Sequence, residues 1–176
     1  MLNATHFELF NLPAAFAIDL SRLDQAYRKL QAEVHPDRFA AAPAAERLRS
    51  MQLATQVNEA YQTLKSPLAR ARYLLHLNGV DTGEETNTSM PPEFLMRQME
   101  WREAIEEAEQ ARDPDALDRL LAELRHESLA LTDVLRNDID QTRNYAGAAE
   151  AVRKLRFLDK VQAEIEQAAE ALEENL

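Results

Sequence analysis

The sequence predicts an all-α protein, in which an N-terminal antiparallel helical hairpin is joined to a C-terminal three-helix bundle. Three observations lead to this fold class. Only 3 of the 176 residues are glycine, while Ala, Leu, Glu, Gln and Arg are abundant, and this composition favours helix. Apolar residues recur at helical spacing between capping and proline signals. No stretch of alternating β-branched residues typical of a strand is found.

The first 78 residues contain signals for four helices, which are expected at residues 5–10, 20–34, 44–64 and 67–77. Asp19 is a favourable N-cap for the second helix. This helix should stop at His35, because Pro36 disfavours helix at the residue before it. Ser66-Pro67 starts the fourth helix and Asn78-Gly79 ends it.

Two apolar stripes mark the faces on which the second and third helices should pack. The stripe of the second helix consists of Leu20, Leu23, Tyr27, Leu30 and Val34. The stripe of the third helix consists of Leu53, Val57, Ala60, Tyr61 and Leu64. A polar, Ala-rich loop through Pro43 separates them, so an antiparallel hairpin is expected.

Residues 79–92 have the composition of a linker, being rich in Thr, Gly, Glu and Pro and lacking periodicity. Three more helices are expected at about 92–111, 114–135 and 143–172. Asp113-Pro114 starts the second of them, and Gly147 weakens the start of the third. Short connections make these helices an antiparallel bundle. The predicted domains are therefore residues 1–78 and 93–176, joined by the linker 79–92.

The net charge of −11 is unevenly distributed along the chain. Residues 1–78 carry 9 Lys and Arg against 7 Asp and Glu, whereas residues 79–176 carry 11 against 24. Nucleic acid is not expected as a partner of so acidic a second half, because such binding depends on cations that neutralise phosphates. The acidic half instead suits a basic protein surface.

Other classes of function lack the residues that they need. The chain has no cysteine, which excludes disulfides and thiolate-held metals or clusters. His6, His76 and His126 show no ligand spacing, so neither a metal nor a cofactor is expected. No apolar run approaches the ~20 residues that span a membrane, and the first ten residues resemble neither a signal nor a transit peptide. We expect a cytoplasmic bacterial monomer that does not bind membranes.

The tripeptide His35-Pro36-Asp37 follows an amphipathic helix with Arg28 and Lys29 on its outer side. An antiparallel helix ending in NEAYQTL at 58–64 comes after it. This arrangement resembles the J-domain. The resemblance implies that the tripeptide and the basic helix face dock on a chaperone ATPase of the DnaK/HscA class and stimulate ATP hydrolysis.

The chemistry of the tripeptide fits such a contact. Pro36 rigidifies the turn, and Asp37 offers an acceptor-only carboxylate for an Arg or Lys of a partner. His35 offers both a donor and an acceptor, while Arg38 extends the cationic strip. Two residues, Asp24 and Val34, depart from those common in general-purpose J-domains, which bears on the choice of chaperone.

The second half of the chain narrows the family, because no Gly/Phe-rich or cysteine-rich segment follows the J-domain. Its continuation resembles the HscB family of iron–sulfur cluster co-chaperones. The matching segments are SPLARARYLL at 66–75, FLM at 94–96 and RKLRFLDK at 153–160. The resemblance implies that the C-terminal bundle binds an IscU-type scaffold, which carries the nascent cluster, and delivers it to the chaperone HscA.

The helix expected at 92–111 has two different faces when residues are placed at about 100° intervals. One arc holds Phe94, Trp101, Ile105 and Ala108, the natural core face. The opposite side holds three apolar residues and three acids, namely Leu95, Met96, Met99, Glu100, Glu103 and Glu107. The resemblance implies scaffold contacts at these six positions and at Phe157. The residues alone leave open whether the apolar three are core and the acids a solvated face.

Three other functions remain as alternatives. An enzyme would use His35 as a base oriented by Asp37, but residues two apart across a proline turn do not readily form that bond, and neither a nucleophile nor a Gly-rich loop accompanies them. We therefore predict a protein that is not an enzyme. A J-protein for another client and a structural helical adaptor are the remaining rivals. The favoured hypothesis joins a chaperone-stimulating J-domain to a scaffold-binding bundle.

Overall fold

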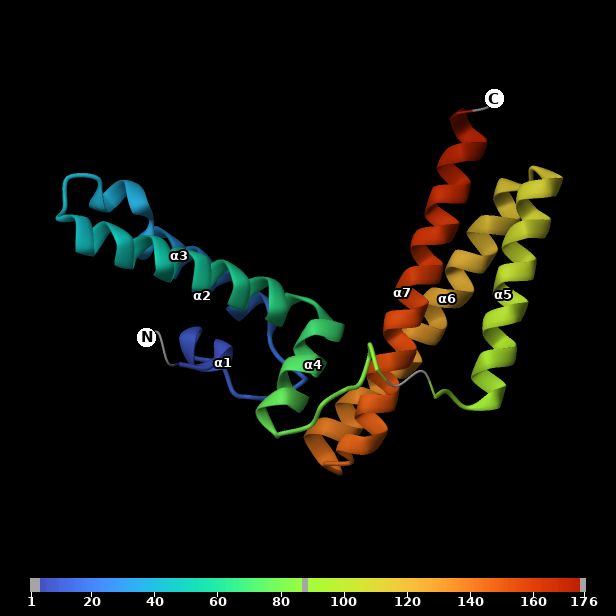
Figure 1. Ribbon diagram of the computed structural model, residues 1–176, viewed down its shortest axis with the longest axis horizontal. Helices are drawn as coiled ribbons and strands as arrows, with labels where there is room; N and C mark the ends of the chain where they lie inside the picture. The colour runs from blue at the N-terminus through green and yellow to red at the C-terminus, as the bar shows by residue number, and fades with distance from the viewer. Residues whose placement is uncertain (1–3, 87–88, 175–176) are drawn as a thin grey trace.

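A computed structural model describes residues 4–86 and 89–174. Residues 1–3, 87–88 and 175–176 lie outside the described residues, and they include part of the N-terminus considered above and two residues of the predicted linker. Every regular element of the described chain is helical, so the all-α prediction is confirmed. Figure 1 shows two arms that diverge from a common junction near α4.

The first arm, called here the hairpin arm, consists of α2, a short 3₁₀ helix η1 and α3, with α1 and α4 at its base (Figure 1). The bounds are α1 His6–Leu9, α2 Leu20–Val34, η1 Pro36–Phe39, α3 Ala44–Lys65 and α4 Pro67–Leu77. The expected loop after His35 is therefore wrong in its first part, because Pro36 begins a helical turn. Leu20 is also not buried as predicted, because the buried stripe of α2 begins only at Leu23.

The second arm, called the bundle arm, is formed by the long helices α5, α6 and α7 (Figure 1). Its elements are α5 Pro92–Ala111, α6 Pro114–Arg136, a π-helical turn η2 Asn137–Gln141 and α7 Tyr145–Glu174. The last helix begins two residues later than expected, because Arg143 has a φ of 54°, in the left-handed region that a right-handed helix excludes. The predicted caps are confirmed: Asp19, Ser66 and Asp113 each accept a backbone N–H of the following turn.

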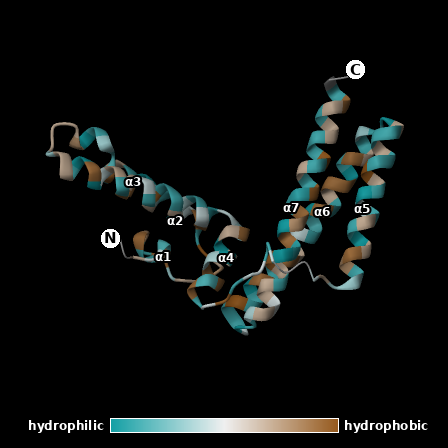
Figure 2. Ribbon diagram, in the orientation of Figure 1, coloured by the Kyte–Doolittle hydropathy of each residue, from teal (hydrophilic) through white to brown (hydrophobic). Residues whose placement is uncertain are grey.

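One apolar core joins the two arms. The buried residues of α1 to α4, among them Phe7, Phe16, Leu23, Leu64 and Leu75, form a single cluster with the ends of α6 and α7 that carry Leu135 and Val152. A second cluster, around Trp101, Leu124 and Leu158, fills the rest of the bundle arm. Figure 2 shows the resulting mixture of hydrophobic and hydrophilic residues along the helices of both arms. The arms are thus packed together at α4 and α7.

Polar side chains fix the junction at its centre. The Asp140 carboxylate, presented by η2, accepts the backbone N–H groups of Phe16 and Ala17 at 2.7 and 2.9 Å. Arg70 is buried beside them, donates to the Leu64 carbonyl at 2.7 Å and lies 4.8 Å from the Phe16 ring centroid. Burial lowers the pKa of Arg70. The bond to Leu64 gives one nitrogen of the buried guanidinium a partner, without which its burial would be penalised.

Packing explains why glycine occupies position 147, although glycine is unfavourable in a helix. It lies in the first turn of α7, where a Cβ atom would come within 2.6 Å of Asp138 Oδ2 and still closer to Asn144 Nδ2. The Asn144 side chain also accepts the Gly147 N–H at 3.2 Å. The absence of a side chain therefore permits the close approach of η2 to α7.

The described part of the predicted linker is held against both arms. Glu84 of this segment accepts two hydrogen bonds of 2.5 Å from the Arg72 guanidinium of α4 and one of 2.7 Å from the Thr82 hydroxyl. Arg153 of α7 donates to the Thr82 carbonyl at 2.9 Å. Burial acts to raise the pKa of Glu84, but the bonds from Arg72 and Thr82 and the nearby charge of Arg156 lower it below the usual value.

The Glu84 contacts predict acid-sensitive stability. A carboxyl whose pKa is lowered by folding stabilises the folded state above its unfolded pKa of about 4.3, and this contribution is lost as the pH falls through the folded pKa. We expect Glu84→Gln to cost about 1–3 kcal/mol at pH 7 and progressively less below pH ~4. Urea unfolding followed by circular dichroism measures this. The exposed neighbour Glu85 provides the control, and equal losses for Glu84→Gln and Glu85→Gln would contradict the prediction.

Candidate functional site

His35-Pro36-Asp37 lies at the far end of the hairpin arm, where α2 ends and η1 begins (Figure 1). His35 has extended backbone angles, with ψ 129°, and ends α2 as predicted. Its side chain is 51% exposed, and that of Asp37 is 91% exposed. The loop thus offers an imidazole and a carboxylate to solvent from one rigid turn.

The contact between His35 and Asp37 differs from that of a catalytic base and its orienting carboxylate. The backbone N–H of Asp37 donates to His35 Nδ1 at 3.3 Å, so Nδ1 serves as an acceptor. The Asp37 carboxylate lies 3.6 Å from the same nitrogen, beyond hydrogen-bond distance. A carboxylate that orients a base accepts an N–H from it, and here that nitrogen already accepts one. The loop is therefore built to present both groups outward.

Two side chains that were not predicted as supports, those of Ser50 and Arg38, hold the end of α2 under this loop. Ser50 of α3 is buried and donates to the Val34 carbonyl at 2.8 Å. Arg38 donates to the Ala32 carbonyl at 3.1 Å while remaining exposed. Carbonyls in the last turn of a helix have no partner within it, so these bonds complete α2. A signal for Ser50 existed, since it stands on the apolar side of α3, seven residues before Val57.

Arg28 and Lys29 are exposed on α2, as the amphipathic pattern predicted. Asp24, which departs from the J-domain pattern, has a structural role in this hairpin. The Tyr61 hydroxyl of α3 donates to Asp24 at 2.9 Å, and Lys65 donates to the Tyr61 oxygen at 3.0 Å. This bond raises the pKa of Lys65. The three residues tie α2 to α3 at the base of the arm.

On the bundle arm, α5 has the two faces that its sequence predicts. Trp101, Ile105 and Ala108 are buried in the core. Leu95, Met96 and Met99 are 44%, 63% and 72% exposed, so the alternative that these three belong to the core is wrong. The acids of the same face, Glu100, Glu103 and Glu107, are exposed as well. The structure thus brings an apolar and an acidic patch together on one surface of α5.

Phe157 reaches this region from α7. Its ring is half-buried and packs edge to face with Phe94, with centroids 5.9 Å apart. The Arg102 guanidinium of α5 lies over the same ring, 5.8 Å from its centroid. Phe157 therefore lies beside the first turn of α5, next to the residue that precedes Leu95.

Arg97 is a residue of this region that sequence reasoning missed. It lies between Met96 and Met99 in the chain, yet its guanidinium turns toward α6, where it binds Glu123 and lies 3.8 Å from Glu127. It also contacts Glu100 at 3.2 Å. The contact with Glu100 is local, at i,i+3 spacing, but only the packing of α5 on α6 brings Arg97 to Glu123 and Glu127.

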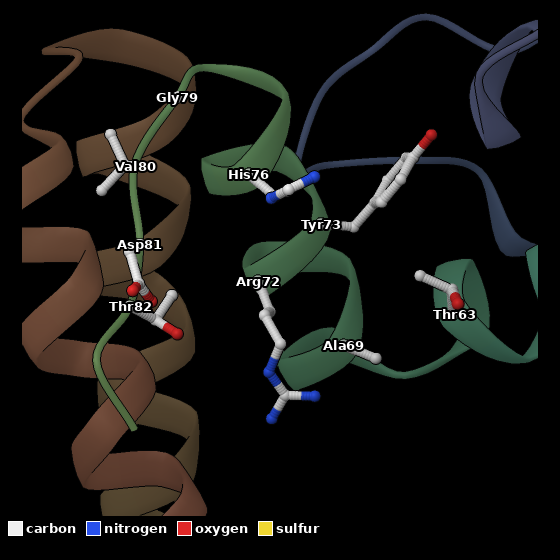
Figure 3. A pocket seen from close by; sticks show the side chains of 9 residues that line it. All are labelled: Thr63, Ala69, Arg72, Tyr73, His76, Gly79, Val80, Asp81 and Thr82. Carbon is white, nitrogen blue, oxygen red and sulfur yellow. The ribbon is translucent and has the colours of Figure 1, made fainter. Parts of the chain in front are cut away.

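A groove at the junction lies between α4 and residues 79–82. Figure 3 shows Tyr73, His76 and Arg72 of α4 on one side, and Val80, Asp81 and Thr82 on the other. Its one guanidinium, that of Arg72, is already paired with Glu84. The guanidinium that lines this groove is therefore already bonded within the chain.

The histidines and carboxylates of residues 4–86 and 89–174 do not form a metal site. His6 stacks on Tyr73 with ring centroids 4.2 Å apart, while His76 and His126 are exposed. No group of three or more His, Cys, Asp or Glu side chains in these ranges is placed to hold a metal ion. None of their helices combines the length and apolar character needed to cross a bilayer.

Comparison with known proteins assigns a family to each half of the chain. The model of the DnaJ domain matches residues 5–73, and that of the HSCB C-terminal oligomerisation domain matches residues 90–166. A "co-chaperone protein HscB homolog" of Paraburkholderia xenovorans is 58% identical over 172 residues, which are 98% of either chain. A homolog with the same name from Burkholderia mallei has the same identity and coverage.

Solved structures agree with these matches. Chaperone HscB from Vibrio cholerae is similar with a TM-score of 0.86 and 39% identity, and the match covers 96% of this chain and 99% of that one. The human co-chaperone protein HscB is similar with a TM-score of 0.88 and 30% identity, covering 94% of this chain and 82% of the human one. Fold and sequence thus point to one family over nearly the whole chain.

The support of the loop by Ser50 is open to a direct test. Ser50→Ala leaves the buried Val34 carbonyl without its bond, and we expect a loss of about 1–2 kcal/mol in the free energy of unfolding. Thr55→Ala is the matched control, because the Thr55 hydroxyl also donates to a carbonyl, at 3.0 Å, but is exposed. Urea denaturation compares the two. Similar losses for both variants would show that burial of the Ser50 bond is unimportant.

Proposed function

Since this chain belongs to the HscB family of co-chaperones, we propose that it stimulates the ATPase of an HscA/DnaK-class chaperone and delivers an IscU-type iron–sulfur scaffold to it, aiding the maturation of iron–sulfur proteins. The observation that carries the proposal is that two arms, joined by one apolar cluster, carry two exposed surfaces of different chemistry. One is the loop of the hairpin arm, and the other is the apolar and acidic face of α5.

The hairpin arm is suited to the chaperone contact. The exposed Asp37 carboxylate can accept charge-assisted bonds from a partner's Arg or Lys. Exposed cations on the same arm, namely Arg28, Lys29 and Arg38, favour an acidic partner surface. Because the chaperone supplies the ATPase site, this chain acts by binding, in keeping with relatives that are named co-chaperones.

The α5 surface is suited to the scaffold contact. Leu95, Met96 and Met99 expose flexible apolar side chains that adapt to a partner. The bordering acids add attraction to a basic rim. Half-buried Phe157 extends the apolar area from the neighbouring helix.

The junction supports a mechanism of delivery. A scaffold held on α5 and a chaperone held at the loop are kept at a separation fixed by the packing of α4 on α7. Holding both raises the effective concentration of the scaffold at the chaperone. This chain then works as a spacer with two specific ends.

The chaperone half of the proposal predicts a loss of stimulation in His35→Gln. Without the His35 imidazole, we expect the stimulation of an HscA-type ATPase to fall at least about tenfold at any scaffold concentration, as for loss of a central contact residue. Steady-state ATPase assays measure this, with the exposed His126→Gln as control. Failure of the wild-type chain to stimulate either an HscA-type or a DnaK chaperone would exclude the J-domain role.

The scaffold half predicts a different phenotype for Leu95→Ala/Met96→Ala/Met99→Ala. Loss of apolar area should raise the scaffold concentration needed for half-maximal synergy by about tenfold or more, and leave scaffold-independent stimulation unchanged. Leu129→Ala/Val134→Ala, which alters two exposed apolar residues of α6, is the control. Stimulation that requires His35 but ignores the scaffold would indicate a J-protein with another client.

A further inference from the structure

The edge between α5 and α6 carries more charge than the α5 face alone. Arg97 contacts three carboxylates at once, those of Glu100, Glu123 and Glu127. Two of these belong to α6, and the side chains of all three are 40% to 60% exposed. The acidic surface assigned to α5 is therefore continuous with acids on α6.

The group holds one cation for three anions. One guanidinium cannot neutralise three carboxylates, and Glu103 and Glu107 add two more acids on the same side of α5. The guanidinium also lies 5.3 Å from the ring centroid of Trp101, so an aromatic face adds to the carboxylates that surround this cation. The arrangement is that of a receptor for a guanidinium or ammonium group, in which Arg97 is an internal occupant.

We propose that the scaffold-docking surface crosses from α5 onto α6, where Glu123 and Glu127 join Glu100 in binding a Lys or Arg side chain of the scaffold. The inference rests on the proposed function, since it takes the IscU-type scaffold as the occupant. When that side chain binds, the Arg97 guanidinium leaves its contacts with these carboxylates.

The position of the group favours this occupant. Arg97 directly follows Met96 in the chain, so the acids border the exposed apolar patch. An interface with an apolar centre and a charged rim places a partner's cations at this border. Arg97 is 39% exposed, and ion pairs at such exposure contribute little in water and exchange partners readily.

The test compares two variants that remove the same charge from the bundle arm. Glu123→Gln/Glu127→Gln alters the proposed contact, and Glu106→Gln/Glu109→Gln alters exposed acids of α5 outside it. Calorimetry with an IscU-type scaffold should show binding weakened by about threefold to tenfold, and a smaller dependence on salt, only for the first variant. Equal effects of the two variants, or none, would overturn the inference.

Arg97→Gln supplies the second arm of the test. Removal of the internal occupant should tighten scaffold binding about twofold to fivefold at low salt and steepen its salt dependence. If Arg97 only joins α5 to α6, Arg97→Gln should lower the unfolding temperature without tightening scaffold binding. That result would contradict the proposal that Arg97 is displaced by the scaffold. If the wild-type chain does not bind the scaffold, the proposed function fails first, independently of these variants.

Discussion

The packing of α4 against the lower part of α7 is the contact on which the other features of this molecule depend. Residues such as Leu75 on α4 and Val152 on α7 belong to one buried cluster, so neither arm has a core that ends at the junction. Burial of apolar area stabilises at roughly 25 cal/mol per Å², and the gain here is shared by both arms. Separation of the arms would expose this area, which is why the two exposed surfaces keep one arrangement.

Apolar burial does not by itself select one way of packing the two arms together. The polar contacts of the junction favour one packing, because hydrogen bonds require specific partners. Asp140 binds two consecutive backbone N–H groups of the segment that leads into α2, which fixes where that segment meets η2. Glu84 binds Arg72 from the opposite edge. A buried polar group without a partner is costly, so alternative packings that break these bonds are disfavoured. These bonds therefore favour the observed packing of the two arms.

The two arms use their surfaces in different chemical ways. At the loop, cations and one exposed carboxylate stand on a hairpin that is almost neutral overall. On α5, apolar side chains stand beside acids in a half of the chain with 24 Asp and Glu. Surfaces of such different character suit partners of different charge and polarity. Within the acidic half, Arg97 limits the repulsion among carboxylates that face one another across α5 and α6.

The sequence by itself determined the helices, their caps, the exposed tripeptide and the two faces of α5, because these features arise from residues within one or two turns of each other. Asp19 and Asp113 cap their helices as their positions predict. The helical angle between Met96 and Trp101 was enough to predict that Met96 is exposed and Trp101 is buried. Misjudged details, such as Leu20 and the start of α7, lie at helix ends, where periodicity is weakest.

Only the tertiary structure decided how the helices meet and which distant side chains pair. Phe16 and Asp140 are 124 residues apart, and Arg97 and Glu123 are 26 apart. Gly147 is unfavourable for its own helix and fits only because η2 approaches it. The physical reason is that capping and periodicity act over a few residues, whereas these contacts depend on how complete helices pack.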